Sequence, residues 1–275
     1  MLSSLLFVAL SNLSACSEDS PAPVEPPRPV EPAGPAKLDL AALASAAENV
    51  ALVPSPAEMQ KALERAGIAT GLSGLVADRT LKMDIENKDV IAVRTGVAMA
   101  DALLTVKDAP PGKLTARLTL VKTGMTALGG GADIGATIDD INARITNNSV
   151  SREDLVKELD EIHGAIIPEI KFEAGERAVP LIQAGSWLEG SNLVSGAIVA
   201  ANNETAGTEL LRQPQVADYF LKYVAVEGAG KAPDAVLAQL QTTLTRLKEI
   251  SSKPTLTLDD VKEVKAQTDA VLALL

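Results

Sequence analysis

Residues 178–202, AVPLIQAGSWLEGSNLVSGAIVAAN, contain a single charged side chain, that of Glu189. A membrane-spanning helix would rarely place Gln, Ser, Asn and Glu together near its middle. A helix that is apolar on nearly all its faces belongs instead inside a bundle of helices. Its small residues, which would let other helices approach closely, are Gly185, Ser186, Gly190, Ser191, Ser195 and Gly196. We therefore predict an all-α fold, a multi-helix bundle around a central apolar helix over 176–203.

The composition supports the same fold class. Aromatic residues make up 2% of the 275-residue chain and hydrophobic residues 47%. Strands favour aromatic and β-branched residues, whereas helices favour Ala, Leu, Glu and Lys, so this composition favours helices and an aliphatic core. We find neither a convincing strand alternation nor the internal repeat of a helical solenoid.

Helix boundaries are marked by capping residues. Ser55 and Glu58 form the pattern of a capping box and Gly67 follows as a stop signal, while Thr257 and Asp260 repeat the box near the other end of the chain. Further helical runs are expected over 38–50, 87–106, 113–128, 133–147, 152–166, 176–203, 214–226 and 233–250. The breaks between them include Pro110-Pro111, Gly129 to Gly131, Gly207 and Gly228 to Gly230.

Two sets of apolar residues recur at helical spacing. The first predicts one buried face on the helix over 87–106, formed by Val90, Val93, Val97, Ala100 and Leu104. The second predicts a hairpin in which Leu237, Leu240, Leu244 and Leu247 face Val261, Val264, Thr268 and Val271. We expect a bundle domain over 38–228 with the hairpin, 229–275, packed on it.

Several functional classes are excluded by charge and residue counts. The net charge of −11 leaves no basic footprint for nucleic acid. One cysteine excludes an internal disulfide, and one histidine, His163, excludes a zinc site built from several Cys or His ligands. The glycine-rich stretch at 129–131 lacks the lysine of a phosphate loop, and Asp133, Asp139 and Asp140 lack the spacing of a calcium loop. We expect no cofactor, no metal site and no catalytic residue.

Glu189 is the most unusual ionisable residue, because an isolated buried charge is very unfavourable. Arg94 and Asp101 lie seven residues apart in one helical run, hence on a similar face, and would supply a pairing cation and a second carboxylate. Two interpretations remain. The group forms a polar pocket with a perturbed carboxylate, or it forms a satisfied buried ion pair that fixes helix register, which we favour.

Most of the aromatic surface after residue 172 comes from Trp187, Tyr219, Phe220 and Tyr223. These side chains line a ligand groove, or they fill gaps in an aliphatic core; we favour the core.

The only cysteine, Cys16, follows an uncharged stretch over 2–15 whose apolar part is shorter than the ~20 residues that span a bilayer. This stretch is typical of the apolar region of a secretory signal. The four residues Leu13 to Cys16, LSAC, resemble the lipobox of bacterial lipoproteins. The resemblance implies a signal peptide over 1–15, cleavage before Cys16, diacylglycerol on its thiol, and a fatty acid such as palmitate on its amino group. The sequence departs from the pattern because no Lys or Arg precedes the apolar stretch.

Residues 16–37 form the expected link between this anchor and the helices. Residues 17–37 contain seven of the sixteen prolines, which predicts a disordered, semi-rigid tether. A proline-rich ligand for a partner protein is the rival interpretation. Ser17, rather than Asp, follows the cysteine, and by the same resemblance this favours the outer membrane, with the periplasmic or the surface face left open.

A second resemblance concerns the segments TGVAMADALL, residues 95–104, and AGSWLEG, residues 184–190. They are similar to segments of uncharacterised all-helical lipoproteins of Gram-negative bacteria. The resemblance implies that Asp101, Trp187 and Glu189 are related elements of one packed site, and it implies no reaction. Together with Arg94, they form the candidate buried polar site of this chain.

These observations predict a membrane-anchored lipoprotein of the cell envelope, held by lipid through Cys16, that binds or helps to assemble an envelope protein partner without enzymatic activity. The alternative is a small-ligand or hydrolase-like site around Glu189, Asp101 and Arg94. A cavity with convergent polar groups would favour the alternative, and an exposed apolar surface would favour a partner.

Overall fold

The computed structural model describes residues 53–68, 71–130, 132–173, 175 and 177–275. Ten helices and no strand lie within these ranges, which confirms the predicted all-α bundle. The helices are α2 (Pro56–Arg65), α3 (Lys88–Thr105), α4 (Pro111–Leu128), α5 (Ala132–Thr146), α6 (Arg152–Glu173), α7 (Ala178–Ala201), α8 (Glu204–Leu211), α9 (Pro214–Glu227), α10 (Asp234–Ser251) and α11 (Leu258–Leu272). The expected signal peptide, Cys16, the tether and the helix over 38–50 lie outside the described residues.

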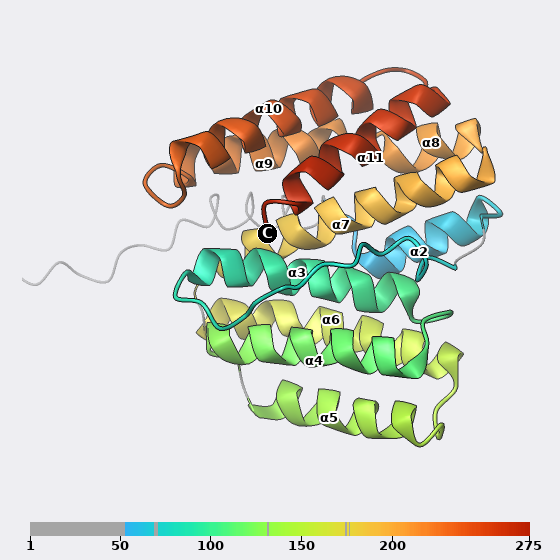
Figure 1. The fold of residues 1–275 in the computed structure, drawn as a ribbon, viewed down its shortest axis with the longest axis vertical. Helices are drawn as coiled ribbons and strands as arrows, with labels where there is room; N and C mark the ends of the chain where they lie inside the picture. The colour runs from blue at the N-terminus through green and yellow to red at the C-terminus, as the bar shows by residue number, and fades with distance from the viewer. Residues whose placement is uncertain (1–52, 69–70, 131, 174, 176) are drawn as a thin grey trace, which may run out of the picture. The chain divides into compact units, whose positions relative to one another are not determined.

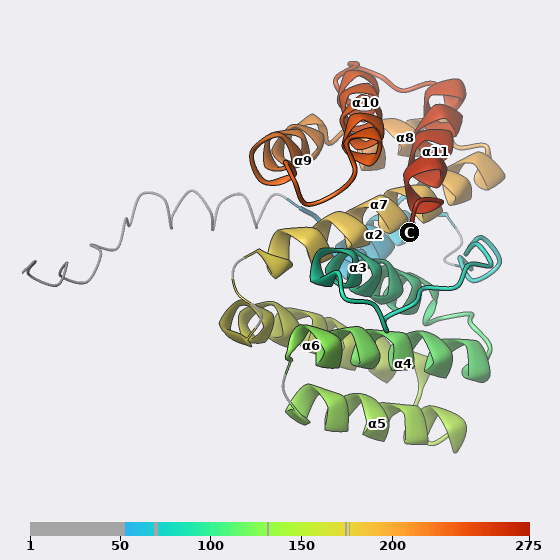
Figure 2. The same cartoon turned by 60° about the vertical axis from the view of Figure 1, so that its left-hand side comes forward.

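The helices pack around the pair α3 and α7. On one side α4 packs against α3, and α5 packs against α4 (Figure 1). On the other side α11 packs along α7, and α9 packs along α10. Figure 2 shows the same two groups, with α4, α5 and α6 beyond α3, and α9, α10 and α11 beyond α7. The buried side chains are mostly aliphatic, as the composition predicts.

Both predicted capping boxes are present. The hydroxyl of Ser55 accepts a hydrogen bond from the amide of Glu58, and the Glu58 carboxylate accepts one from the amide of Ser55. Thr257 and Asp260 make the same reciprocal bonds at the start of α11. The first backbone N–H groups of each helix are thereby satisfied locally, so these boundaries could be located from sequence.

Helix α8 differs from the prediction, which places a break at Gly207. Asn203 caps the helix by accepting a hydrogen bond from the amide of Ala206 at 3.1 Å. Gly207 lies inside the helix, where a Cβ atom would stand 2.6 Å from Cγ2 of Val261 on α11. The glycine therefore serves close packing between α8 and α11 rather than a turn.

The contact between α3 and α7 is a contact between backbones. A Cβ atom at Gly96 would lie 1.9 Å from the carbonyl oxygen of Ile182, and one at Gly185 would lie 2.0 Å from that of Val93. The close approach at Gly185 agrees with the prediction from the small residues of α7. The prediction of one buried face on α3 is too narrow, because every residue over 95–105 is buried.

The last two helices are integrated with the rest. Residues 53–275 belong to a single compact unit. The buried Asn192 of α7 donates to the hydroxyl of Thr268 at 3.0 Å and to the carboxylate of Asp269 at 2.6 Å, which holds α11 on α7. The guanidinium of Arg246 on α10 donates two hydrogen bonds, of 2.6 and 2.9 Å, to the carboxylate of Glu263 on α11.

Candidate functional site

The connection between α2 and α3 contains an extended segment that carries a cation into the bundle. Leu81 and Met83 are buried and Arg79 is partly buried, while the residues between them are exposed. Side chains of an extended chain alternate between two sides, so Arg79 lies on the same side as the two apolar residues. This register points Arg79 at the interface of α3 and α7.

Arg79 meets the two carboxyl groups that the sequence analysis singled out. Nη2 of Arg79 contacts Oε2 of Glu189 and lies 3.7 Å from Oδ1 of Asp101. The side chain of Glu189 has no exposed surface, and that of Asp101 is 8% exposed. The structure therefore brings Asp101 and Glu189 together, but the cation of this ion cluster is Arg79.

The prediction that Arg94 supplies the cation is wrong. Its guanidinium donates to the carbonyl oxygen of Lys82 at 2.7 Å and to that of Leu275. Arg94 precedes Asp101 by about 10 Å along α3, and both side chains point back toward the N-terminus of the helix, so their ends stay far apart. Arg94 instead ties the extended segment and the end of the chain after α11 to α3.

The surroundings of Asp101 favour its protonated form. Burial raises the pKa of Asp101 well above its usual range, and the charge of Glu189 and a hydrogen bond to it raise it further, while Arg79 and Arg117 lower it. Neither carboxyl group lines the two cavities described below. The geometry thus fits a buried ion cluster at the contact of α3 and α7, in which Oε1 of Glu189 and Nε of Arg79 find no hydrogen-bond partner among the described residues.

Trp187 belongs to a different cluster. Its indole N–H donates to the side-chain oxygen of Gln213 at 2.9 Å, and its ring centroid lies 5.4 Å from that of Phe220. Because Trp187 and Glu189 are two positions apart on α7, they point to different sides of the helix. Trp187 and Phe220 are buried, which agrees with the favoured core interpretation, but Phe220 and Tyr223 also line an apolar groove.

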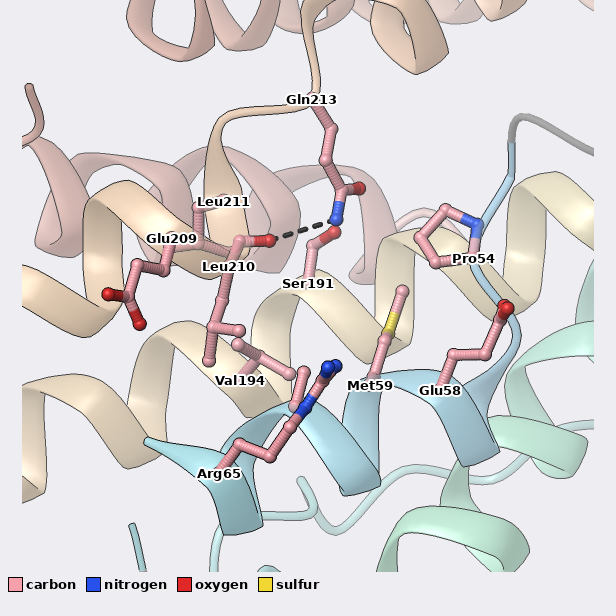
Figure 3. Close-up of a pocket in the computed structure, with 11 residues that line it drawn as sticks. Pro54, Glu58, Met59, Arg65, Ser191, Val194, Glu209, Leu210, Leu211 and Gln213 are labelled. Atoms are coloured by element: carbon pink, nitrogen blue, oxygen red, sulfur yellow. Dashed lines mark hydrogen bonds between the residues drawn. The ribbon is translucent and has the colours of Figure 1, made fainter. Parts of the chain in front are cut away.

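A polar cavity of about 330 Å³ lies between α2, α7 and the chain around α8. In Figure 3 the hydroxyl of Ser191 points into it from α7 and the guanidinium of Arg65 points into it from α2. Gln213 is held by a hydrogen bond from its amide nitrogen to the carbonyl oxygen of Leu210, 2.9 Å long. Sequence reasoning missed this cavity because it treated Ser191 only as a small residue for helix packing.

A second cavity, which we call the apolar groove, has a volume of about 200 Å³ and lies between α3, α7, α9, α10 and the end of α11. Its walls are formed mainly by aliphatic side chains, among them Val93, Leu181, Leu188, Leu237, Leu240, Leu244 and Leu274. Leu274 is also one of the exposed large hydrophobic residues, with 49% of its surface accessible. The sequence did not predict the groove; Leu237 and Leu240 were expected to face α11.

Polar residues gather where α3 and α7 begin. Arg177, which precedes α7, binds Asp89 of α3 with Nε–O and Nη2–O distances of 3.1 and 2.8 Å, and binds Glu227 of α9 at 2.8 Å. The hydroxyl of Tyr223 donates to the carbonyl oxygen of Arg177 at 3.3 Å. Three helices are thereby fixed at this end of the apolar groove.

The remaining candidates are placed as follows. Asp139 pairs with Lys122 and Asp140 pairs with Arg144. In the described part of the chain, no group of three or more His, Cys, Asp or Glu residues is placed to hold a metal ion. His163 is partly buried, and burial lowers its pKa.

Within the described ranges, none of the helices has both the length and the apolar character needed to cross a bilayer. No protein-family model, curated protein or solved structure matches this chain.

Proposed function

We propose that this chain is a lipid-anchored protein of the bacterial cell envelope that binds an apolar ligand without transforming it. The apolar groove carries the proposal. Ligand sites in proteins are concave and mostly apolar, with a few polar groups that fix orientation, and the groove has this composition.

The physical basis is the poor hydration of the groove. A water molecule in a cavity needs two to four polar partners, and an apolar cavity of roughly 150 Å³ stays dry and binds small apolar molecules. The aliphatic walls of the groove offer few such partners away from its polar end. An apolar ligand would fill the space and remove apolar surface from water at roughly 25 cal/mol per Å².

The anchor would give this binding its location. Acylated Cys16 would hold the protein at the outer membrane, and the 16–37 tether would let the helices reach lipid or a neighbouring envelope protein. Confinement raises the effective concentration of the groove toward such a partner. We propose that the partner supplies or receives the ligand.

The alternative, a hydrolase-like site around Glu189, Asp101 and Arg94, has less support. Arg94 points elsewhere, and the side chain of Glu189 is fully buried. A general acid or base must come within hydrogen-bond reach of its substrate, and these carboxyl groups line neither cavity described above.

Binding in the groove is tested with a fluorescent naphthyl probe that brightens in apolar surroundings. We expect the full-length chain to bind it, and we expect Ala184→Phe, which fills the groove, and Leu240→Gln, which makes its wall polar, each to weaken binding at least about tenfold, or about 1.4 kcal/mol. Ala116→Phe places the same ring on an exposed position of α4 and should leave binding unchanged. Equal binding by all four folded proteins would exclude the groove as the site.

The anchor is tested by Cys16→Ser. We expect the wild-type protein to be labelled by fatty acid and to fractionate with membranes, and the variant to lose both properties, because its residue 16 has no thiol to acylate. Ser14→Thr, a small change inside the same motif, is the control and should remain labelled. Membrane fractionation that is unchanged in Cys16→Ser, with no fatty-acid label on the wild type, would refute the anchor.

A further inference from the structure

We propose that the ligand of the apolar groove is a single-chain amphiphile with an anionic head group. Its hydrocarbon chain lies along the groove, and its head lies at the end where α3, α7 and α10 begin. This inference rests on the proposed function and adds the chemical class and the orientation of the ligand.

The groove changes from polar to apolar along its length. Arg177 stands before the first residue of α7, while Leu188 lines the groove about 16 Å farther along that helix. Lys231 precedes α10, while Leu244 lies well inside it. The first residues of α3, α7 and α10 lie at the same end of the bundle, on the left in Figure 1. A ligand with one polar end and one apolar end matches this gradient in a single orientation.

The polar end offers one cation that is not used in an ion pair. The charged residues that line the groove are Asp89, Arg177 and Lys231. Asp89 is engaged with Arg177, which also holds Glu227. Lys231 is exposed, and no ion pair joins it to another described residue. This local cation stands out against a net charge of −11 and would attract an anionic head group.

The beginning of α7 adds to this preference. Arg177, the residue before α7, makes no side-chain hydrogen bond to the first turn, and that turn contains no acidic residue. The N–H groups of a first turn carry partial positive charge and favour an anion. In α10, by contrast, Asp234 already stands in the first turn.

The volume limits the ligand to one chain. An apolar cavity of roughly 150 Å³ accommodates a benzene molecule. The groove, at about 200 Å³, has room for part of one slender hydrocarbon chain, with the rest extending along the surface past Leu274. Two parallel acyl chains or a fused ring system would exceed this space.

The inference is tested with three ligands that share a twelve-carbon chain and differ in the head: dodecanoate, dodecanol and dodecyltrimethylammonium. Each displaces the naphthyl probe from the full-length Cys16→Ser chain, below its micelle concentration and without detergent. We expect dodecanoate to bind about tenfold more tightly than dodecanol, or about 1.4 kcal/mol, and the ammonium compound to bind most weakly. The advantage of dodecanoate should shrink as salt rises from about 10 to about 300 mM.

Lys231→Glu should remove the preference for dodecanoate and leave dodecanol binding unchanged. Lys113→Glu makes the same charge change on α4, away from the groove, and should preserve the preference. If Lys231→Glu melts at a lower temperature than the parent chain, Lys231→Gln serves in its place, with a smaller loss.

The outcomes separate this inference from the proposed function. Equal affinity for the three head groups, or a preference that survives in Lys231→Glu, would overturn the anionic head while leaving an apolar ligand in the groove. Failure of the folded chain to bind the naphthyl probe or any of the three ligands would overturn both.

Discussion

Arg79→Met is expected to lower the free energy of unfolding by about 3–5 kcal/mol at pH 7, because it removes the cation from a buried ion cluster. Glu189 has no exposed surface, and its carboxyl group, beside Asp101, would lose the cation that it contacts. Methionine keeps much of the length and the apolar stem of arginine, so the loss of charge dominates the change. Urea unfolding followed by circular dichroism measures the effect.

Lys82→Met is the matched control for this prediction. Lys82 lies on the same extended segment, but it is exposed, and Arg94 contacts only its backbone oxygen. Surface substitutions of this kind change stability by about 0.5 kcal/mol or less. If Arg79→Met unfolded at the same urea concentration as Lys82→Met, the ion cluster would not depend on Arg79.

The pH dependence of the same cluster has a definite sign. The pKa of Asp101 is raised by burial and by Glu189, so the folded protein keeps a proton that the unfolded chain releases above its ordinary pKa of about 4. The stability linked to this proton is fully present below the unfolded pKa and is lost as pH rises through the folded pKa. Asp101→Asn cannot ionise, so its stability relative to the wild type should increase as pH rises over that interval. A stability difference that is constant with pH would contradict the raised pKa of Asp101.

The second large effect is expected from the backbone contact of α3 and α7. Gly96→Ala and Gly185→Ala should each destabilise the protein by about 3 kcal/mol or more, or prevent folding. Overpacking strongly lowers the free energy of unfolding where the neighbouring atoms cannot move away. The new methyl groups would meet carbonyl oxygens at 1.9 and 2.0 Å, and backbone atoms cannot rotate away as a side chain can. Thermal and urea unfolding measure the loss.

Gly164→Ala is the control for the glycine substitutions. Gly164 lies exposed in α6, and a Cβ atom there would have nothing within 4 Å. Alanine should stabilise this position by roughly 0.5–1 kcal/mol, because glycine is the poorer helix former. The double variant Gly96→Ala/Gly185→Ala should lose less than the sum of the single losses, since helices separated by one methyl group partly accommodate the other. Wild-type stability in either single variant would show that α3 and α7 do not touch as described.

The features that could be predicted from the sequence are local ones. The capping box of Ser55 and Glu58 satisfies the hydrogen-bonding groups at the start of its own helix. It therefore marks the helix boundary whatever the helix packs against. The small residues of α7 predicted a close approach, and Gly185 makes one. Gly96 makes the reciprocal contact, but a glycine within a helical pattern has no distinctive signal until its partner is known.

The cation of the ion cluster could not be chosen from helical spacing, because it comes from an irregular segment outside both helices. A signal for Arg79 did exist: it stands two residues before Leu81 and four before Met83, a period of two that places them on one side. The two cavities left no such signal. The apolar groove is assembled from half-buried residues of several helices, and residues of this kind are compatible with either a core or a surface.

The backbone contact at Gly96 and Gly185 also determines which walls of the apolar groove are able to move. Its α3 and α7 wall is stiff, because the two backbones already touch and any sliding would pull Arg79 away from Glu189. The opposite wall, α9 and α10, is held by side chains alone, such as Glu227 of α9, which binds Arg177. Ligand uptake would then proceed by rearrangement of side chains on α9 and α10, while the backbones of α3 and α7 stay in place.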